Sequence, residues 1–301
     1  MRLTALSDAA PRPRRIAIGT FDGVHLGHRE VISGADTVVT FEPHPQSVIA
    51  PGTEPRLLTT LGQKAELIDN LGVEELVVVG FDTDFSSWSA EDFIERAIVD
   101  ALGATQVAVG ENFRFGTKAR GDVDMLRADA RFDARIVPLL EVDGEIVSSS
   151  HIRGLVAGGA VEYAGQLLDR PLWLDGEVVH GDKRGRELGF PTANLVPDPA
   201  LALPAHGVYA CTVEIEPGGE AEGQYVAAVN VGVRPQFHTG RGELVEAYIL
   251  DFDGDLYGRH VRVAFGKRLR GERRFVSVDA LVEQMGRDVE DTREWAARVG
   301  A

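Results

Sequence analysis

Cysteine is almost absent from this sequence, since Cys211 is the single one in 301 residues. One thiol can form neither an internal disulfide nor a thiolate metal cluster, which fits a reducing compartment such as the cytoplasm. Because Cys211 lies in the alternating apolar run 207–215, we expect it to be a small buried residue of a strand.

Long hydrophobic runs and an excess of positive charge are also missing. No run reaches the ~18 apolar residues that a membrane-spanning helix needs, and the first residues lack the apolar core of a signal peptide. Asp and Glu total 47 against 31 Lys and Arg, so the net charge of -16 would repel a polyanion. We therefore expect a soluble cytoplasmic protein that binds neither membranes nor nucleic acid.

The first half of the chain alternates short apolar runs with amphipathic stretches. The apolar runs lie at 16–21, 36–41, 75–81, 106–113 and 135–139, and the stretches with helical spacing lie at 61–72 and 89–103. Continuous Val/Ile runs suit strands that are covered on both faces. The alternation predicts an α/β domain with a parallel, Rossmann-like sheet, whose ligand sits at the carboxyl ends of the strands.

The second half has a different pattern. A stretch with helical spacing at 148–168 precedes short runs rich in Val and aromatics, at 174–181, 207–216, 224–232, 243–252 and 260–269. Frequent short strands separated by turn residues indicate a mostly antiparallel β-barrel or sandwich, and 277–299 adds terminal helices. A chain of 301 residues suits two domains, which we place at 1–168 and 169–301.

Two histidines three positions apart mark the turn after the first of these strands, in Gly19–His28. At a strand-to-helix turn such a pair faces one way, beside backbone N–H groups with partial positive charge. Gly27, between His25 and His28, would let a phosphate approach the backbone closely. The residues fit neither a Walker A loop nor the GxGxxG pattern, so a phosphate site here would be built with imidazole. The alternative is a glycine-rich turn in which the histidines are polar caps.

A second candidate anion site lies in His180–Leu195. Three glycines four positions apart could wrap an anion, and three cationic side chains between them would supply countercharge. The glycines are Gly181, Gly185 and Gly189, and the cations are Lys183, Arg184 and Arg186. A hairpin with a solvated basic tip would explain the same composition.

The histidine turn resembles the HxGH signature of the nucleotidyltransferase superfamily. Three further stretches, Phe41–Pro45, Gly110–Gly116 and Ser148–Arg153, follow in the order seen in bacterial bifunctional riboflavin kinase/FAD synthetases. The last of them departs from the family at one position, since Ser150 stands where a threonine is usual. The resemblance implies that the first domain is an FMN adenylyltransferase.

The same resemblance assigns roles to individual residues. It implies that His25 and His28 bind the triphosphate of ATP and stabilise the charge that develops at its α-phosphate. The nucleotide- and flavin-binding residues that it implies are Gly19, Phe21, Asp22, Gly27, Asn112, Phe113, Ser149, Ser150 and Arg153. From the residues alone, Phe113 would more often be a core residue and Arg153 a solvated one.

The stretch Pro191–Asn194 resembles the Pro-Thr-Ala-Asn signature of riboflavin kinases. The resemblance implies that Thr192 and Asn194 hold Mg²⁺ with the phosphates of ATP, which suits a hard cation that prefers oxygen ligands. The nucleotide-binding residues that it implies are Gly181, Lys183, Gly185, Arg186, Thr192 and Asn194. Glu246 occupies the place of the family's catalytic base. The alternative is an edge-strand glutamate that points to water.

Two other charged clusters have a simpler interpretation. The acidic cluster is Asp251, Asp253 and Asp255, and the basic cluster is Arg270, Arg273 and Arg274. The acidic residues do not match EF-hand spacing, so we interpret them as solvated acids of a hairpin turn. The basic cluster lies in a stretch that resembles the kinase module. The alternative is a solvated basic start to the terminal helices.

Together these features predict a two-step enzyme. Its barrel would phosphorylate riboflavin to FMN with ATP, and its N-terminal domain would transfer an adenylyl group from ATP to FMN, giving FAD and pyrophosphate. Only Asp22–Ala35 connects the first two strands of the motif, so the helix after it should have about two turns, shorter than in the family. That departure motivates a second interpretation, a riboflavin kinase with a weakened adenylyltransferase. A third is a non-catalytic flavin-binding protein, and nothing in the sequence indicates an oligomer.

Overall fold

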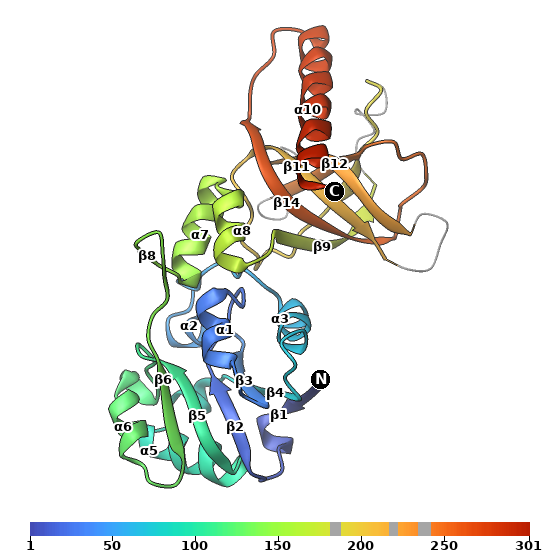
Figure 1. The fold of residues 1–301 in the computed structure, drawn as a ribbon. Helices are drawn as coiled ribbons and strands as arrows, with labels where there is room; N and C mark the ends of the chain where they lie inside the picture. Colours follow the sequence, from blue (N-terminus) through green and yellow to red (C-terminus); the bar gives the residue numbers. More distant parts are fainter. Residues whose placement is uncertain (181–187, 217–221, 234–241) are drawn as a thin grey trace. The chain divides into compact units, whose positions relative to one another are not determined.

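The computed structural model describes residues 1–180, 188–216, 222–233 and 242–301. The chain divides into two compact units, Met1–His151 and Ile152–Ala301, and each is described by itself (Figure 1). The domain boundary expected between residues 168 and 169 stays a prediction. In the described part of the chain, no helix combines the length and the apolar character needed to cross a membrane.

The first unit is built on a six-stranded parallel sheet with the strand order β1-β4-β3-β2-β5-β6. The strands are β1 (Arg2–Ala5), β2 (Arg14–Ile18), β3 (Thr37–Glu42), β4 (Glu75–Gly80), β5 (Ala104–Gly110) and β6 (Asp133–Val137). The last five confirm the predicted apolar runs. β1 was not predicted, because it is a four-residue edge strand with mostly exposed side chains and carries no apolar pattern.

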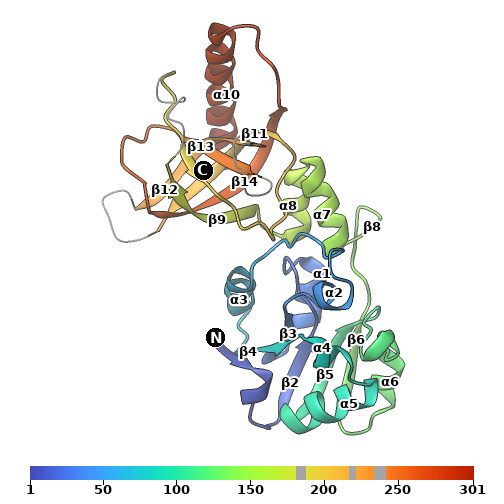
Figure 2. The same ribbon diagram turned by 180° about the vertical axis from the view of Figure 1, so that it is seen from behind.

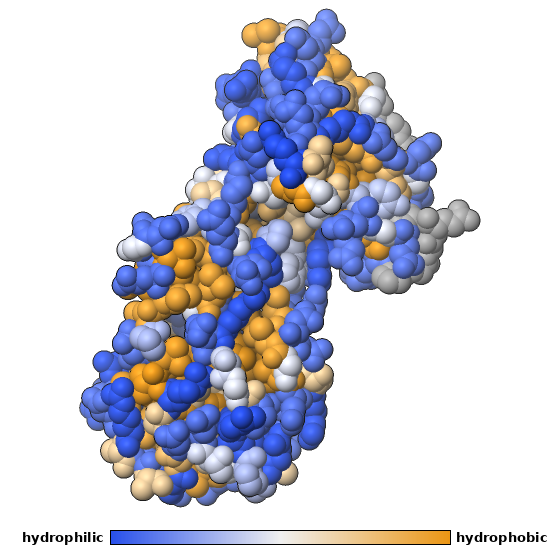
Figure 3. Space-filling view, in the orientation of Figure 1, coloured by the Kyte–Doolittle hydropathy of each residue, from blue (hydrophilic) through white to orange (hydrophobic). Residues whose placement is uncertain are grey.

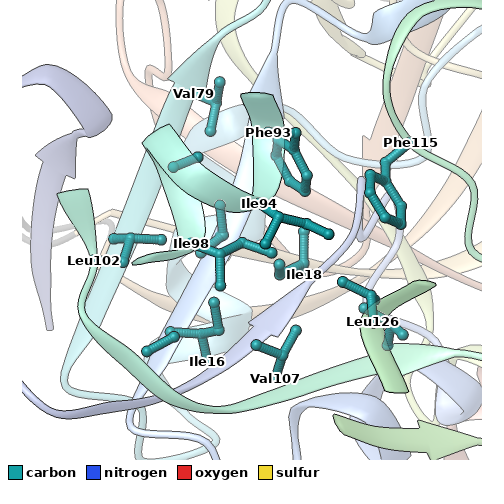
Figure 4. Close-up of a cluster of buried hydrophobic side chains, with 14 of the residues drawn as sticks. Ile16, Ile18, Val79, Phe93, Ile94, Ile98, Leu102, Val107, Phe115 and Leu126 are labelled. Atoms are coloured by element: carbon teal, nitrogen blue, oxygen red, sulfur yellow. The ribbon is translucent and has the colours of Figure 1, made fainter. Parts of the chain in front are cut away.

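Helices and short turns connect these strands. The helices are α1 (Leu26–Ile32), α2 (Pro45–Ile49), α3 (Leu61–Asp69), α4 (Thr83–Ser86), α5 (Ala90–Asp92) and α6 (Val123–Ala128). The shorter elements are η1 (Leu6–Asp8), the π-helical η2 (Phe93–Ala101), η3 (Thr117–Ala119) and the hairpin strands β7 (Glu141–Val142) and β8 (Glu145–Ile146). Ile16 and Ile18 of β2 pack against Phe93 and Ile98 of η2 in the core that anchors the central strand (Figure 4).

The strand order places a topological switch point beside β2. From β2 the chain moves through β3 to β4 on one side, and then returns to β5 on the other side of β2. The loops that leave the carboxyl ends of β2 and β5 therefore diverge, which is where doubly wound sheets bind their ligands.

Two helices lie where one had been predicted, and the first of them starts three residues before the second unit. α7 (Ser149–Gly158) and α8 (Val161–Leu168) are separated at Gly159, whose φ is 80°. The Arg268 side chain fills the space beside this glycine, since a Cβ there would lie 2.7 Å from its Nη1, and it donates a hydrogen bond to the Gly158 carbonyl. This contact with a residue far along the chain explains why local spacing alone suggested an unbroken helix.

The six strands of the second unit form a closed barrel with the order β10-β13-β12-β11-β14-β9 (Figure 2). Of the two predicted architectures, the structure has the barrel and not the sandwich. The strands are β9 (Leu172–Val179), β10 (Ala193–Leu195), β11 (Gly207–Ile215), β12 (Gly223–Val233), β13 (Glu243–Ile249) and β14 (His260–Gly271). Every described pairing among them is antiparallel. Cys211 is fully buried in β11, as predicted, and burial raises the pKa of its thiol.

One long helix, α10 (Val278–Val299), closes the described chain where several terminal helices were expected. It packs on β11, β12 and β14, and Trp295 lies directly over Gly266 of β14. Arg270 pairs with Asp288 of α10 through Nη2–Oδ2 and Nε–Oδ1 distances of 2.7 and 2.9 Å, and both side chains are largely buried. The interpretation of Arg270 as a solvated residue is therefore wrong. About half of the side chains of α10 are exposed, and Figure 3 shows mainly hydrophilic residues on the visible face of this helix.

Candidate active sites

Asp22 fixes the turn that carries the two histidines to the segment before α3. Its buried Oδ1 accepts hydrogen bonds from the backbone N–H groups of Leu58 and Thr59, at 2.8 and 3.2 Å. Phe21 and Val24 have positive φ values of 48° and 44°, a conformation that non-glycine residues adopt only when the surroundings fix it. The surroundings therefore hold the turn in one conformation.

The two imidazoles lie against one another at the start of α1. His25 caps the helix, and its Nδ1 accepts a hydrogen bond from the His28 backbone N–H at 3.3 Å. The rings stack with centroids 3.5 Å apart and an angle of 17° between their planes. A Cβ on Gly27 would lie 3.3 Å from the His25 ring, so the glycine lets the backbone approach it closely. In the neutral form, an imidazole whose Nδ1 accepts a hydrogen bond carries its proton on Nε2.

His28 has an unusual electrostatic environment. Its Nδ1 is buried and has no hydrogen-bond partner in the described part of the chain, and the edge of Phe21 packs on the ring. Burial lowers the pKa of His28 well below 6.5, and the nearby His25 and Lys64 lower it further. The ring is therefore neutral at pH 7 and acts there as a hydrogen-bonding group and not as a fixed positive charge.

Helix α1, which begins between the two histidines, is as short as the sequence predicts. α1 has seven residues, about two turns. A helix of this length adds little dipole of its own, so anion binding at this turn depends on side chains and individual N–H groups.

Three further predicted stretches end at or near the same edge of the sheet. Phe41–Pro45 includes the end of β3, and Gly110–Gly116 begins at the end of β5, the strand on the other side of the switch point. Ser149, in the third stretch, donates its hydroxyl to the Asp22 carbonyl at 2.9 Å, which ties the start of α7 to the histidine turn. The structure thus brings Ser149 together with the histidine turn.

The remaining predicted residues of this site have varied surroundings. Asn112 is exposed, and Phe113 is half-buried and stacked on the buried Phe115, with ring centroids 5.6 Å apart. Phe113 also packs against the hydrophobic core, so the core interpretation of this residue holds in part. Ser150 is exposed, and Arg153 lies one helical turn after Ser149 on α7. Gly19 lies against the Phe21 ring, and a Cβ added to this glycine would be 3.0 Å from the ring.

Sequence reasoning missed one residue of this region, Lys64. It lies on α3, is only 6% exposed, and donates from Nζ to Thr40 Oγ1 at 3.2 Å. Burial lowers the pKa of Lys64, while the carboxylates of Asp22 and Glu42 raise it. The sequence held a signal, since helical spacing places Lys64 on the same face as the apolar Leu67 and Ile68.

In the second unit, three polar residues lie side by side across adjacent strands. Asn194 of β10 is opposite Glu246 of β13, which in turn is opposite Asn230 of β12. Asn230 Nδ2 donates to Glu246 Oε2 at 3.2 Å. Val245 and Ala247, on either side of Glu246, are buried inside the barrel, so Glu246 lies on the outer face of the strand. β13 is paired on both sides, which excludes the interpretation of Glu246 as an edge-strand residue.

Asn194 contributes an oxygen without a partner. Its side chain is 5% exposed, and Nδ2 donates to the Thr192 carbonyl at 3.3 Å. Its Oδ1 is buried and accepts no hydrogen bond from the described residues. A buried amide oxygen without a partner costs free energy. This oxygen is therefore suited to bind a ligand that donates a hydrogen bond, or a cation that takes oxygen ligands.

Part of the predicted kinase site lies outside the described residues, namely Gly181, Lys183, Arg184, Gly185 and Arg186. Thr192 is half-buried directly before β10.

Of the acidic cluster, Asp251 is an exposed turn residue, as expected, and its carboxylate also forms a two-point ion pair with Arg293, at 2.6 and 2.7 Å. Asp255 accepts a hydrogen bond from the Tyr257 backbone N–H. Among the described residues, no group of three or more His, Cys, Asp or Glu side chains is placed to hold a metal ion.

Two protein-family models match the chain. Residues 7–151 match the family model for FAD synthetase, and residues 168–296 match the model for riboflavin kinase. The bifunctional riboflavin kinase/FMN adenylyltransferase of Bacillus subtilis is 36% identical over 92% of this chain and 90% of its own length. The protein of the same name from Escherichia coli K12 is also 36% identical, over 96% of this chain and 95% of its own length.

A solved structure from Streptococcus pneumoniae, described as a macrolide-efflux protein, superposes with a TM-score of 0.87. It is 32% identical in sequence, and the match covers 98% of this chain and 100% of that one. Its description names no flavin chemistry, so this likeness supports the fold, whereas the sequence relatives bear on the activity.

Proposed function

The chain belongs to the family of bifunctional riboflavin kinase/FMN adenylyltransferases, and we propose that the histidine turn and the barrel perform its two reactions separately. The enzyme phosphorylates riboflavin to FMN and adenylylates FMN to FAD. ATP is the phosphoryl donor in the first reaction and the adenylyl donor in the second.

In the kinase reaction, Glu246 is the general base that accepts the proton of the ribityl 5′-hydroxyl. The hydroxyl oxygen attacks the γ-phosphorus of ATP, the bond to the β-phosphate oxygen breaks, and ADP leaves. Asn230 holds one carboxylate oxygen of Glu246 by its hydrogen bond, which leaves the other oxygen for the substrate. Burial of Val245 and Ala247 fixes the strand on which Glu246 is displayed.

Asn194 and Thr192 are suited to hold Mg²⁺. The unpartnered Oδ1 of Asn194 and the hydroxyl of Thr192 are neutral oxygen donors, which a hard cation accepts together with phosphate oxygens and waters. Mg²⁺, when bound, supplies charge neutralisation for the phosphates of ATP.

In the adenylyl transfer, a phosphate oxygen of FMN attacks the α-phosphorus of ATP. The bond from that phosphorus to the bridging oxygen of the β-phosphate breaks, and pyrophosphate leaves with the electron pair. His25 Nε2 and His28 donate hydrogen bonds to phosphate oxygens, which stabilises charge that grows in the transition state. Asn112, Phe113, Ser150 and Arg153 are assigned to the nucleotide and flavin by the family motif.

The observation that carries this proposal is the stacked pair of imidazoles at the switch point of the parallel sheet. The test supplies riboflavin or FMN with ATP and Mg²⁺ and separates the flavins by chromatography. We expect FMN and FAD from riboflavin, and FAD from FMN. Production of FMN without FAD would favour the kinase with a weakened adenylyltransferase, for which the seven-residue α1 is the motivating feature. Flavin binding without consumption of ATP would favour the non-catalytic protein.

A further inference from the structure

A buried ammonium group lies next to the histidine turn, and the reaction described above does not use it. Lys64 Nζ donates to Thr40 Oγ1, and the Thr40 hydroxyl donates to the carbonyl of Thr20 within the turn, at 3.0 Å. Both Lys64 and Thr40 are buried. This chain of hydrogen bonds fixes the ammonium relative to the backbone that carries His25 and His28.

The ammonium has more donors than the protein satisfies. It carries three N–H bonds, and in the described part of the chain Thr40 is its one hydrogen-bond acceptor. Burying a charged group is costly unless its hydrogen bonds are made, so two unused donors in a buried position indicate an acceptor supplied from outside the chain. The carboxylates of Asp22 and Glu42 favour the charged form of Lys64.

Lys64 lies where a side chain that binds phosphate would be expected. The Lys64 charge acts on His28, so the two groups are close, and His28 also has an unpartnered buried nitrogen. α3 is tied to the histidine turn because Leu58 and Thr59, just before the helix, donate to Asp22. Three elements thus converge at the carboxyl ends of β2 and β3, which are adjacent in the sheet.

We propose that Lys64 is a third phosphate-binding group of the adenylyl-transfer site, which binds the β- and γ-phosphate oxygens of ATP and stabilises the departing pyrophosphate. The proposal rests on the function proposed above. When the bond between the α-phosphorus and the bridging oxygen breaks, the electron pair moves to pyrophosphate, and the Lys64 ammonium faces that growing charge while it keeps its own proton. In this role Lys64 provides the fixed positive charge that the neutral His28 does not.

The first test replaces Lys64 by methionine, which has a similar shape and no charge. Lys118→Met is the matched control, because it removes the same charge from an exposed position of the same unit. We expect Lys64→Met to lower kcat/KM for FAD synthesis by about 100-fold or more. Removal of one preorganised donor that faces a developing negative charge typically has an effect of this size. Riboflavin phosphorylation by this variant and FAD synthesis by Lys118→Met should stay within about twofold of wild type, the range expected for a change distant from either site.

The outcome that overturns the proposal is a folded Lys64→Met variant that makes FAD at the wild-type rate. If the wild-type protein itself makes no FAD from FMN and ATP, the proposed function fails instead, so the two failures are distinguishable. The kinase rate of the variant shows whether its second unit is folded, and circular dichroism reports on the whole chain.

A second test uses the wild-type protein and needs no folded variant. The chain has four lysines, Lys64, Lys118, Lys183 and Lys267, so the ¹⁵N resonances of their ammonium groups can be assigned and followed individually. Inorganic pyrophosphate is added until the ring resonances of His25 and His28 stop changing. We expect the Lys64 resonance to shift together with those rings and the Lys118 resonance to stay in place. A Lys64 resonance that does not move while the histidine rings respond contradicts the proposal.

Discussion

The contact between Gly266 and Trp295 makes the docking of α10 on the barrel testable by a single methyl group. An added Cβ at Gly266 would lie 1.9 Å from Cζ2 of the Trp295 ring. Carbon atoms at optimal contact are ~3.5–4.0 Å apart, so the ring must move by about 2 Å or the helix must retreat. Overpacking of this kind typically costs ~1–3 kcal/mol and occasionally more, and a clash this severe places Gly266→Ala at about 3 kcal/mol.

For a unit of this size, 3 kcal/mol corresponds to a fall in Tm of about 6–12 °C. The matched control is Gly286→Ala within α10, where an added Cβ meets nothing within 4 Å. That change should stabilise the helix by ~0.5–1 kcal/mol, because alanine restricts the unfolded chain and favours helix. Calorimetry measures both variants, and a Gly266→Ala protein as stable as wild type would refute the packing argument.

Two further predictions concern the sites themselves. Asn230→Ala removes the hydrogen bond to Glu246, and since a bond to a charged group contributes ~1.5–3 kcal/mol, kcat for riboflavin phosphorylation should fall about 10- to 100-fold, with FAD synthesis from FMN unchanged. Initial rates check this, and an unchanged kinase rate would show that Asn230 does not position Glu246. Because the pKa of His28 is lowered, the folded protein should lose about 1.4 kcal/mol of stability per unit as pH falls below 6.5, until the folded pKa is reached. A ¹⁵N titration of the His28 ring, with and without tripolyphosphate, measures its pKa in the folded protein. We expect the anion to raise that pKa. A ring that titrates at 6.5 in the free protein contradicts the argument.

The elements that the sequence predicts well are those in which local pattern and burial agree. The Val/Ile runs of β3 and β4 are covered on both faces of the sheet, so their apolar character is continuous and unambiguous. The same holds for β11, whose alternating run places Cys211 inside the barrel. β10 was missed because three residues carry no usable period. The break at Gly159 was missed because its cause, Arg268, lies far away in sequence.

The sites divide in the same way. The histidine turn could be found because its residues are consecutive and their spacing is distinctive. The resemblance to riboflavin kinases names Asn194 and Glu246, but the residues alone could not predict their alignment with Asn230. That alignment depends on the register of three strands whose pairing no local pattern fixes. Lys64 was overlooked because a lysine in an amphipathic helix is usually solvated, and only the packing of α3 on the turn shows that this one is buried.

The central claim, that two separate sites perform two reactions, is tested most directly by one product assay on two variants. His28→Ala and Glu246→Gln are each given ATP with riboflavin or with FMN, and the flavins are separated by chromatography. The account predicts that His28→Ala makes FMN but no FAD, and that Glu246→Gln makes no FMN yet converts supplied FMN to FAD. Loss of both activities in either folded variant, or of neither, would contradict it.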